Sequence, residues 1–259
     1  MSDALKITRD NGVVTLTMNE PKSRNALSDD MRSSLSQAIH DLSQDTEVQA
    51  VILTGSGGVF CAGGDLGWMQ QQMAADAETR GREARVLAEA LMLLNTLPKP
   101  LIGALQGNAF GGGVGMASVC DVAIGVDHLK MGLTETKLGL IPATIGPYVV
   151  ARMGEARARR VFMSARLFGA AEAVELGLLA KAVPAQDLAS AVEAEVAPYL
   201  SCAPGAVAAA KKLTRDLGPR LDDAVIDMTI QALVERWEGE EAREGIEAFF
   251  AKRKPAWQG

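Results

Sequence analysis

The chain has 259 residues and a formal net charge of −6, and 48% of its residues are apolar. This length and composition allow one large globular domain, or a domain with an appendage, around a sizeable core. The acidic balance disfavours nucleic acid or an anionic membrane as the main partner. The three widely spaced cysteines form no metal motif, so we expect them to be reduced thiols. The sequence has neither the apolar core of a signal peptide nor a run of about 18 apolar residues, so we expect a cytoplasmic protein.

Strand and helix signals alternate along the first half of the chain. Ser28, followed by Asp29 and Asp30, is typical of a helix N-cap, and apolar residues recur at helical spacing after it. A second long helix is predicted at 78–97. Residues 13–18 are rich in β-branched side chains and predict a strand, and apolar runs of strand length predict further strands at 50–54, 101–105 and 122–126. The runs are too apolar for an open antiparallel sheet, so the pattern favours an α/β fold.

Strand signals become rare after about residue 142, and helices dominate the remainder. We predict helices at 155–165, 171–176, 186–200, 206–217 and 221–237. The shift in pattern places a boundary near residue 200. It divides an α/β core, residues 1–200, from a helical C-terminal region, residues 201–259.

Two glycine-bearing segments are candidates for binding an anion or a developing oxyanion. Gly111, Gly112 and Gly113 follow a predicted strand and precede a small, apolar helical run. Consecutive glycines weaken regular structure, so such a run indicates that something approaches the backbone closely, and a helix start offers unpaired N–H groups. Residues 60–66, FCAGGDL, have the same character. Two such segments could place two N–H donors on one oxygen and form an oxyanion hole, although a tightly packed turn also explains the glycines.

Glu135 is the candidate acid or base. Its segment, 131–140, is apolar on both sides, so a buried carboxylate there would have a raised pKa suited to proton transfer. A surface glutamate paired with Lys137 is the alternative. The two histidines, His40 and His128, belong to no recognisable triad, and the sequence contains no nucleophile elbow, phosphate-binding loop or zinc spacing.

Taken together, these motifs resemble the crotonase family, the enoyl-CoA hydratase/isomerase superfamily. The resemblance spans nearly the whole chain, and the order and spacing of the motifs make it specific although each one alone is weak. The motifs are KSRNAL (22–27), FCAGGDL (60–66), GNAFGGG (107–113), CD (120–121), GLTETKLGLIP (132–142), AAEAVELGLL (170–179) and FFAKRKPAW (249–257).

The resemblance implies a fold, a substrate class and a site. The fold would be a spiral of ββα repeats with C-terminal helices that build a homotrimer or a hexamer. The substrate would be an acyl-CoA thioester, with no metal and no further cofactor, since coenzyme A is part of the substrate. The catalytic set would be Glu135 with the backbone N–H groups of Gly64 and Gly112. The predicted substrate- and CoA-binding residues are Lys22, Arg24, Ala26, Ala62, Asp65, Leu66 and Lys252.

One departure from the family pattern refines the expected function. Typical hydratases carry a second glutamate two residues after the triple glycine, and this chain has Gly115 there. A single glutamate resembles the Δ3,Δ2-enoyl-CoA isomerases and also a bacterial hydratase branch acting on 3-methylglutaconyl-CoA or isoprenoid-derived glutaconyl-CoAs in leucine or terpenoid breakdown. The segments 132–155 and 249–257 look most like that branch, so we favour it over the isomerase and over a non-catalytic CoA-ester- or RNA-binding homologue. We hypothesise that Gly115 leaves space for a distal carboxylate of the substrate.

Overall fold

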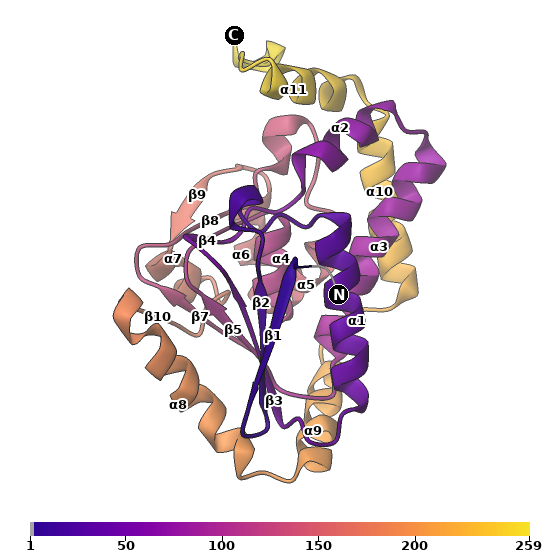
Figure 1. Ribbon diagram of the computed structural model, residues 1–259. Helices are drawn as coiled ribbons and strands as arrows, with labels where there is room; N and C mark the ends of the chain where they lie inside the picture. Colours follow the sequence, from indigo (N-terminus) through magenta and orange to yellow (C-terminus); the bar gives the residue numbers. More distant parts are fainter. Residues whose placement is uncertain (1–2) are drawn as a thin grey trace.

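The computed structural model describes residues 3–259, apart from the side chain of Leu66. Strands form two sheets (Figure 1). In spatial order the six-stranded sheet contains β1 (Leu5–Asp10), β2 (Val13–Met18), β3 (Ala50–Gly55), β5 (Leu101–Leu105), β7 (Val122–Val126) and β10 (Lys181–Val183). The four-stranded sheet contains β4 (Val59–Cys61), β6 (Asn108–Phe110), β8 (Lys130–Gly132) and β9 (Leu167–Gly169). All neighbouring strands are parallel except the outer pairs β1–β2 and β8–β9.

Helices and short 3₁₀ turns connect and cover the strands. The α-helices are α1 (Asp29–Gln44), α2 (Leu66–Ala74), α3 (Ala77–Thr96), α4 (Gly112–Val119), α5 (Gly146–Met153), α6 (Glu155–Phe162), α7 (Ala170–Glu175), α8 (Leu188–Leu200), α9 (Pro204–Leu217), α10 (Asp223–Trp237) and α11 (Glu240–Phe250). The 3₁₀ turns are η1 (Pro21–Ser23), η2 (Glu135–Leu138), η3 (Ala185–Asp187) and η4 (Ala256–Gln258). Within residues 3–259, no helix is long and apolar enough to cross a membrane.

The path of the chain repeats one unit. A strand of the large sheet is followed by a strand of the small sheet and then by helix: β3, β4 and α2–α3; β5, β6 and α4; β7, β8 and η2–α5. Every large-sheet strand in this series lies parallel to the one before it, so the chain spirals in one direction. The predicted α/β spiral of ββα repeats is confirmed.

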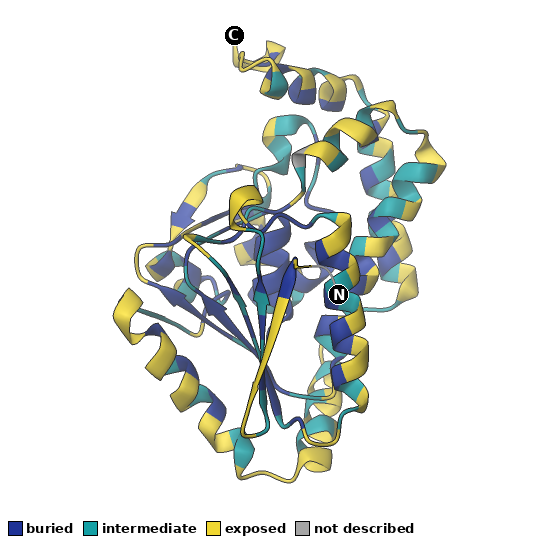
Figure 2. Ribbon diagram, viewed as in Figure 1, coloured by how far each residue is buried: buried dark blue, intermediate teal, exposed yellow. Residues whose placement is uncertain are grey.

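Burial follows from this layering. Figure 2 shows the inner strands buried and β1 exposed along its outer edge, where five of its six residues face solvent. β5 and α4 are buried at every residue, since they lie at the centre of the spiral. α8 packs against β3, β5 and β7, while α1, α3 and α10 pack together along the other side (Figure 1).

The helices after residue 200 share the core of the preceding residues. Ile226 and Trp237 of α10 and Ile246 of α11 are buried within the same apolar cluster as the sheet strands. Lys211 of α9 donates to Asp121 over 2.7 Å and to the carbonyl of Lys99 over 3.1 Å, which holds α9 against the edge of the core. The C-terminal helical region therefore folds back onto its own α/β core.

Candidate active site

The two glycine segments predicted to converge lie in contact. Gly63 has a φ of +90°, and a Cβ atom there would lie 2.7 Å from the carbonyl oxygen of Phe110 and 3.2 Å from the nitrogen of Gly112. A Cβ at Gly112 would lie 3.5 Å from the Cα of Gly63. Only glycine allows such an approach between two backbones. The glycines are there because the ends of β4 and β6 meet at this point.

The predicted oxyanion donors, Gly64 and Gly112, lie on either side of this contact. Gly112 is the first residue of α4, so its N–H is one of the donors that a helix cannot pair internally, at the positive end of the helix dipole. Gly64 forms a β-bridge with Leu27, whose own N–H donates to the carbonyl of Gly63 over 2.8 Å. Among the described residues, neither the Gly64 N–H nor the Gly112 N–H has an acceptor. Two donors are therefore free at adjacent places in the backbone.

Glu135 is the first residue of η2, and its carboxyl lies over the glycine run. A Cβ at Gly111 would lie 2.9 Å from Glu135 Oε1. The other carboxyl oxygen, Oε2, is enclosed and has no hydrogen-bond partner within the described residues. Burial raises the pKa of Glu135 from 4.5 to about 7, and only the residue's own backbone N–H opposes that shift. The alternative of a surface glutamate paired with Lys137 is wrong, because the Glu135 carboxyl points inward.

The predicted CoA-binding residues Lys22, Arg24 and Ala26 lie in one segment beside β4. Lys22 lies in η1 and Arg24 follows it, both exposed, and the carbonyl of Arg24 accepts the N–H of Ala62 over 3.0 Å. Ala26 is buried in the same segment. These four predicted residues thus lie together, and Ala62 directly precedes Gly63 and Gly64 in the chain.

Asn25 holds this segment in place and was not singled out from the sequence. It is fully buried with a φ of +54°, and its Oδ1 accepts the N–H of Glu20 over 2.9 Å. Its Nδ2 donates to the carbonyls of Ser56 and Val59 over 2.9 and 2.8 Å. The signal available in the sequence was an asparagine within KSRNAL, since Asn tolerates a left-handed backbone better than most residues.

Asp65 and Leu66 begin α2, next to Gly64. The Asp65 carboxylate caps the helix by accepting the N–H of Trp68 over 2.9 Å, so its contacts are those of an N-cap. The predicted contact of the Leu66 side chain lies outside the described part of the chain. Asp65 thereby fixes the direction in which the chain leaves Gly64.

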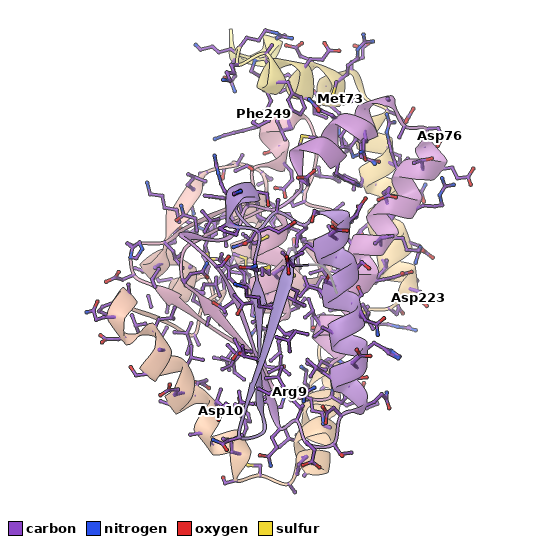
Figure 3. The ribbon with its side chains drawn as sticks, viewed as in Figure 1. Arg9, Asp10, Met73, Asp76, Asp223 and Phe249 are labelled. Carbon is purple, nitrogen blue, oxygen red and sulfur yellow. The ribbon has the colours of Figure 1, made fainter. Side chains whose placement is uncertain are left out.

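Lys252 lies in a hollow of 360 Å³ that it shares with Lys137 and Leu138 of η2. Phe249 of α11 lines the same hollow, and Figure 3 shows this residue at the same end of the molecule as Met73 of α2. The predicted basic contact therefore lies beside the turn that carries Glu135 of its own subunit. Across residues 3–259, no cluster of three or more His, Cys, Asp or Glu side chains could hold a metal ion.

The hypothesis that Gly115 leaves open space is wrong. Gly115 lies in the buried first turn of α4, and a Cβ there would lie 2.4 Å from Cγ2 and 2.9 Å from Cβ of Ile145. Ile145 is itself only 2% exposed. An apolar side chain thus fills the place next to Gly115, and a distal carboxylate would find no room there.

Comparison with known proteins identifies the family. Residues 8–259 match the family described as enoyl-CoA hydratase/isomerase. The chain belongs to this family. An enoyl-CoA hydratase of Mycobacterium tuberculosis, EchA19, is 32% identical over 259 residues, which cover 99% of this chain and 96% of that protein. The predictions of crotonase-superfamily membership and of an enzyme are confirmed.

Solved structures of similar proteins have the same fold. AtuE of Pseudomonas aeruginosa is 37% identical, with a TM-score of 0.80 and coverage of 99% of this chain and 100% of that one. An enoyl-CoA hydratase of Shewanella pealeana is 34% identical, with a TM-score of 0.81 and coverage of 98% and 96%. The match extends through α9, α10 and α11, so these helices belong to the shared fold.

Proposed function

We propose that the protein is a hydratase that adds water across the double bond of an enoyl-CoA thioester, with Glu135 as its single acid and base. The observation that carries this proposal is the arrangement at the end of β6: an enclosed carboxyl with a pKa of about 7 lies beside two free backbone N–H groups. A pKa near the working pH allows one group both to accept and to release a proton.

The proposed reaction needs only water, the Glu135 carboxyl and the N–H groups of Gly64 and Gly112. Ionised Glu135 takes a proton from water while the water oxygen bonds to C3 of the enoyl group. The electron pair of the C2–C3 double bond moves towards the thioester, and negative charge collects on its oxygen. The N–H groups of Gly64 and Gly112 stabilise that enolate oxygen more than the neutral carbonyl, which is the differential binding that lowers a barrier. Protonated Glu135 then returns a proton to C2, and the net change is the addition of one water.

For the acyl group, we propose 3-methylglutaconyl-CoA or a related glutaconyl-CoA. The support is the likeness of residues 132–155 and 249–257 to that hydratase branch. Space beside Gly115 does not support this acyl group, because Ile145 fills it.

We also propose that the protein forms a homotrimer, alone or paired into a hexamer. We propose no cofactor beyond the coenzyme A of the substrate.

A Δ3,Δ2-enoyl-CoA isomerase is the second candidate. It is favoured by one specific observation: Ile145 rather than a second carboxyl lies against Gly115, and moving one proton between C2 and C4 needs only one acid–base group. Glu135 would then exchange that proton over the same oxyanion hole.

A product assay with wild-type enzyme and Glu135→Gln tests both candidates. The substrates are enoyl-CoAs with and without a distal carboxylate, together with a 3-enoyl-CoA. We expect 3-hydroxyacyl-CoA product, fastest from the glutaconyl type, and a loss of about 10²–10⁴-fold in kcat for Glu135→Gln with CoA-ester binding retained. Formation of 2-enoyl product from the 3-enoyl ester without hydration would establish the isomerase. Near-normal turnover by Glu135→Gln would refute the role of Glu135 in either reaction.

A further inference from the structure

The Glu135 carboxyl is held by backbone placement rather than by hydrogen bonds to other side chains. Within the described residues no side chain donates to it, and Oε2 has no partner. Its position therefore depends on η2, the 3₁₀ turn that Glu135 begins. That turn is closed at its far end by Gly139, with a φ of +71°, whose N–H donates to the carbonyl of Thr136 over 3.3 Å, and by Leu140, whose N–H donates to the carbonyl of Glu135 over 3.1 Å. A shift of the turn would move the carboxyl with it.

α11 packs directly against the back of this turn at two glycines. Gly245 lies within α11, and a Cβ there would lie 2.5 Å from the carbonyl carbon and 2.6 Å from the carbonyl oxygen of Leu138. A Cβ at Gly139 would lie 2.4 Å from the carbonyl carbon of Glu241, in the first turn of α11. Two backbones thus meet without a side chain between them, so neither can move towards the other.

Glycine within a helix is less favourable than alanine by about 0.5–1 kcal/mol. At position 245 the backbone of Leu138 lies too close to leave room for a side chain. The helix is fixed on its other contacts as well, since Ala242 and Ile246 are fully buried. Arg236, at the end of α10, adds a hydrogen bond from Nε to the carbonyl of Gly139 over 3.4 Å. α11 therefore packs closely against η2 and is held there by these contacts.

We propose that Gly245 is a positioning residue: the close contact of α11 with Leu138 sets the place of the Glu135 carboxyl over Gly111. This inference rests on the proposed role of Glu135 as acid and base. A methyl group at Gly245 pushes Leu138 away and carries the turn with it. The carboxyl is then displaced from its site over Gly111, and water reaches it.

The variant Gly245→Ala tests the inference, with Gly81→Ala as its matched control. Gly81 also lies inside a helix, α3, and a Cβ there would meet only Ile230 and Val234 at 3.9 and 4.0 Å, which is ordinary contact. Both changes add one methyl group and gain the same helix propensity. We expect Gly245→Ala to lose about 10–100-fold in kcat with KM within about threefold of wild type, by analogy with the loss from misplaced catalytic groups, and Gly81→Ala to keep both constants.

The pH profile supplies a readout that mere destabilisation would not move. Where ionised Glu135 is the base, kcat/KM rises with pH through its pKa, which burial raises to about 7. Hydration of the displaced carboxyl lowers that pKa, so the acidic limb of Gly245→Ala shifts to lower pH. An unchanged limb, or a loss of kcat and KM together, would overturn the inference and leave α11 as support for the fold alone.

Arg236→Gln covers the case in which Gly245→Ala fails to fold. It removes the guanidinium beside the Gly139 carbonyl and adds no atom to the contact. We expect the same signature, a lower kcat with KM retained and an acidic limb at lower pH, at about 3–10-fold in kcat. If Glu135→Gln is inactive while the folded variants keep the wild-type kcat and pH limb, only the positioning inference is wrong. If Glu135→Gln keeps turnover, the proposed function and this inference are both wrong.

Discussion

The buried carboxyl of Glu135 predicts that catalysis and stability oppose each other at this residue. Its pKa is raised by burial from 4.5 to about 7, so the folded protein binds a proton there that the unfolded chain has released at pH 5–7. Between pH 4.5 and 7 the folded state binds more protons at Glu135 than the unfolded state does. The contribution of Glu135 to the free energy of unfolding is therefore fully present below pH 4.5 and is lost as the pH rises through 7. The difference between the folded and unfolded pKa of Glu135 lowers the free energy of unfolding by about 3 kcal/mol at pH 8, relative to its value at low pH.

Glu135→Gln removes the ionisation while keeping the shape of the side chain. We expect this variant to be more stable than wild type by up to about 3 kcal/mol at pH 8, and the gain to vanish near pH 4.5. Urea unfolding at both pH values and one fixed protein concentration measures the two differences. A gain that is equal at both pH values, or absent at pH 8, would show that the carboxyl is solvated in the folded protein.

Glu244→Gln is the control of opposite sign. Two bonds from Arg253, together with the N–H of Ala256, lower the pKa of the Glu244 carboxyl to about 2. A lowered folded pKa contributes stability above the unfolded pKa of 4.5, which is lost as pH falls through about 2. Replacement by Gln should therefore lower stability at pH 8, and the sign of the change separates a desolvated carboxyl from a paired one.

Two further predictions concern contacts near the site. Gly115→Ala should destabilise the protein by about 1–3 kcal/mol because the added methyl group meets Ile145, and Ile145→Ala should relieve that cost. A double-mutant cycle in urea measures the coupling between the two residues, and strictly additive changes in the free energy of unfolding would contradict the contact. Asn25→Ala should lower the free energy of unfolding by about 1–3 kcal/mol and raise KM for the CoA ester. The change leaves the N–H of Glu20 and the carbonyls of Ser56 and Val59 without their partner. Unfolding curves and kinetics on the same preparation measure both effects.

The long elements of the fold could be predicted from the sequence because each carries a complete local signal. The strands at 13–18, 101–105 and 122–126 have the predicted bounds. The first is rich in β-branched residues and alternates between buried and half-buried positions, and the other two are nearly continuous apolar runs. The first helix begins after Ser28, whose hydroxyl accepts the N–H of Met31 over 3.2 Å, as an N-cap does. Local propensity and burial agree at these places.

The short elements could not be predicted in the same way. β4, β6, β8 and β9 each have three residues, too few to show a period of two, and they exist because the small sheet pairs them. β1 has an exposed, charged pattern, LKITRD, and is held by pairing with β2 along its whole length. α11 lacks a clear signal because Gly245 interrupts it, and the reason for that glycine is the backbone of Leu138, more than 100 residues earlier in the chain.

The same division applies to the candidate site. The two glycine segments could be singled out from the sequence because consecutive glycines weaken regular structure, which indicates that something approaches the backbone closely. The surroundings of Gly115 could not, because Ile145 lies 30 residues later and the contact between them is purely tertiary. The absence of a side chain at residue 115 indicated space, whereas tight packing of an apolar neighbour is the commoner reason for a glycine inside a buried helix.

That contact also bears on how one carboxyl can serve a hydration. Ile145 lies against Gly115, and within residues 3–259 no second carboxylate contributes to the pKa shift of Glu135. Desolvation raises the pKa to about 7 against the opposing effect of the residue's own backbone N–H, and protonated and ionised forms are both populated at neutral pH. A second carboxylate beside it would raise this pKa further through like-charge repulsion, and one of the two groups would then stay protonated at pH 7. A single carboxyl that exists in both forms can take the proton from water and return it to carbon in the proposed hydration, and the same property would serve proton transfer between C2 and C4 in the isomerase.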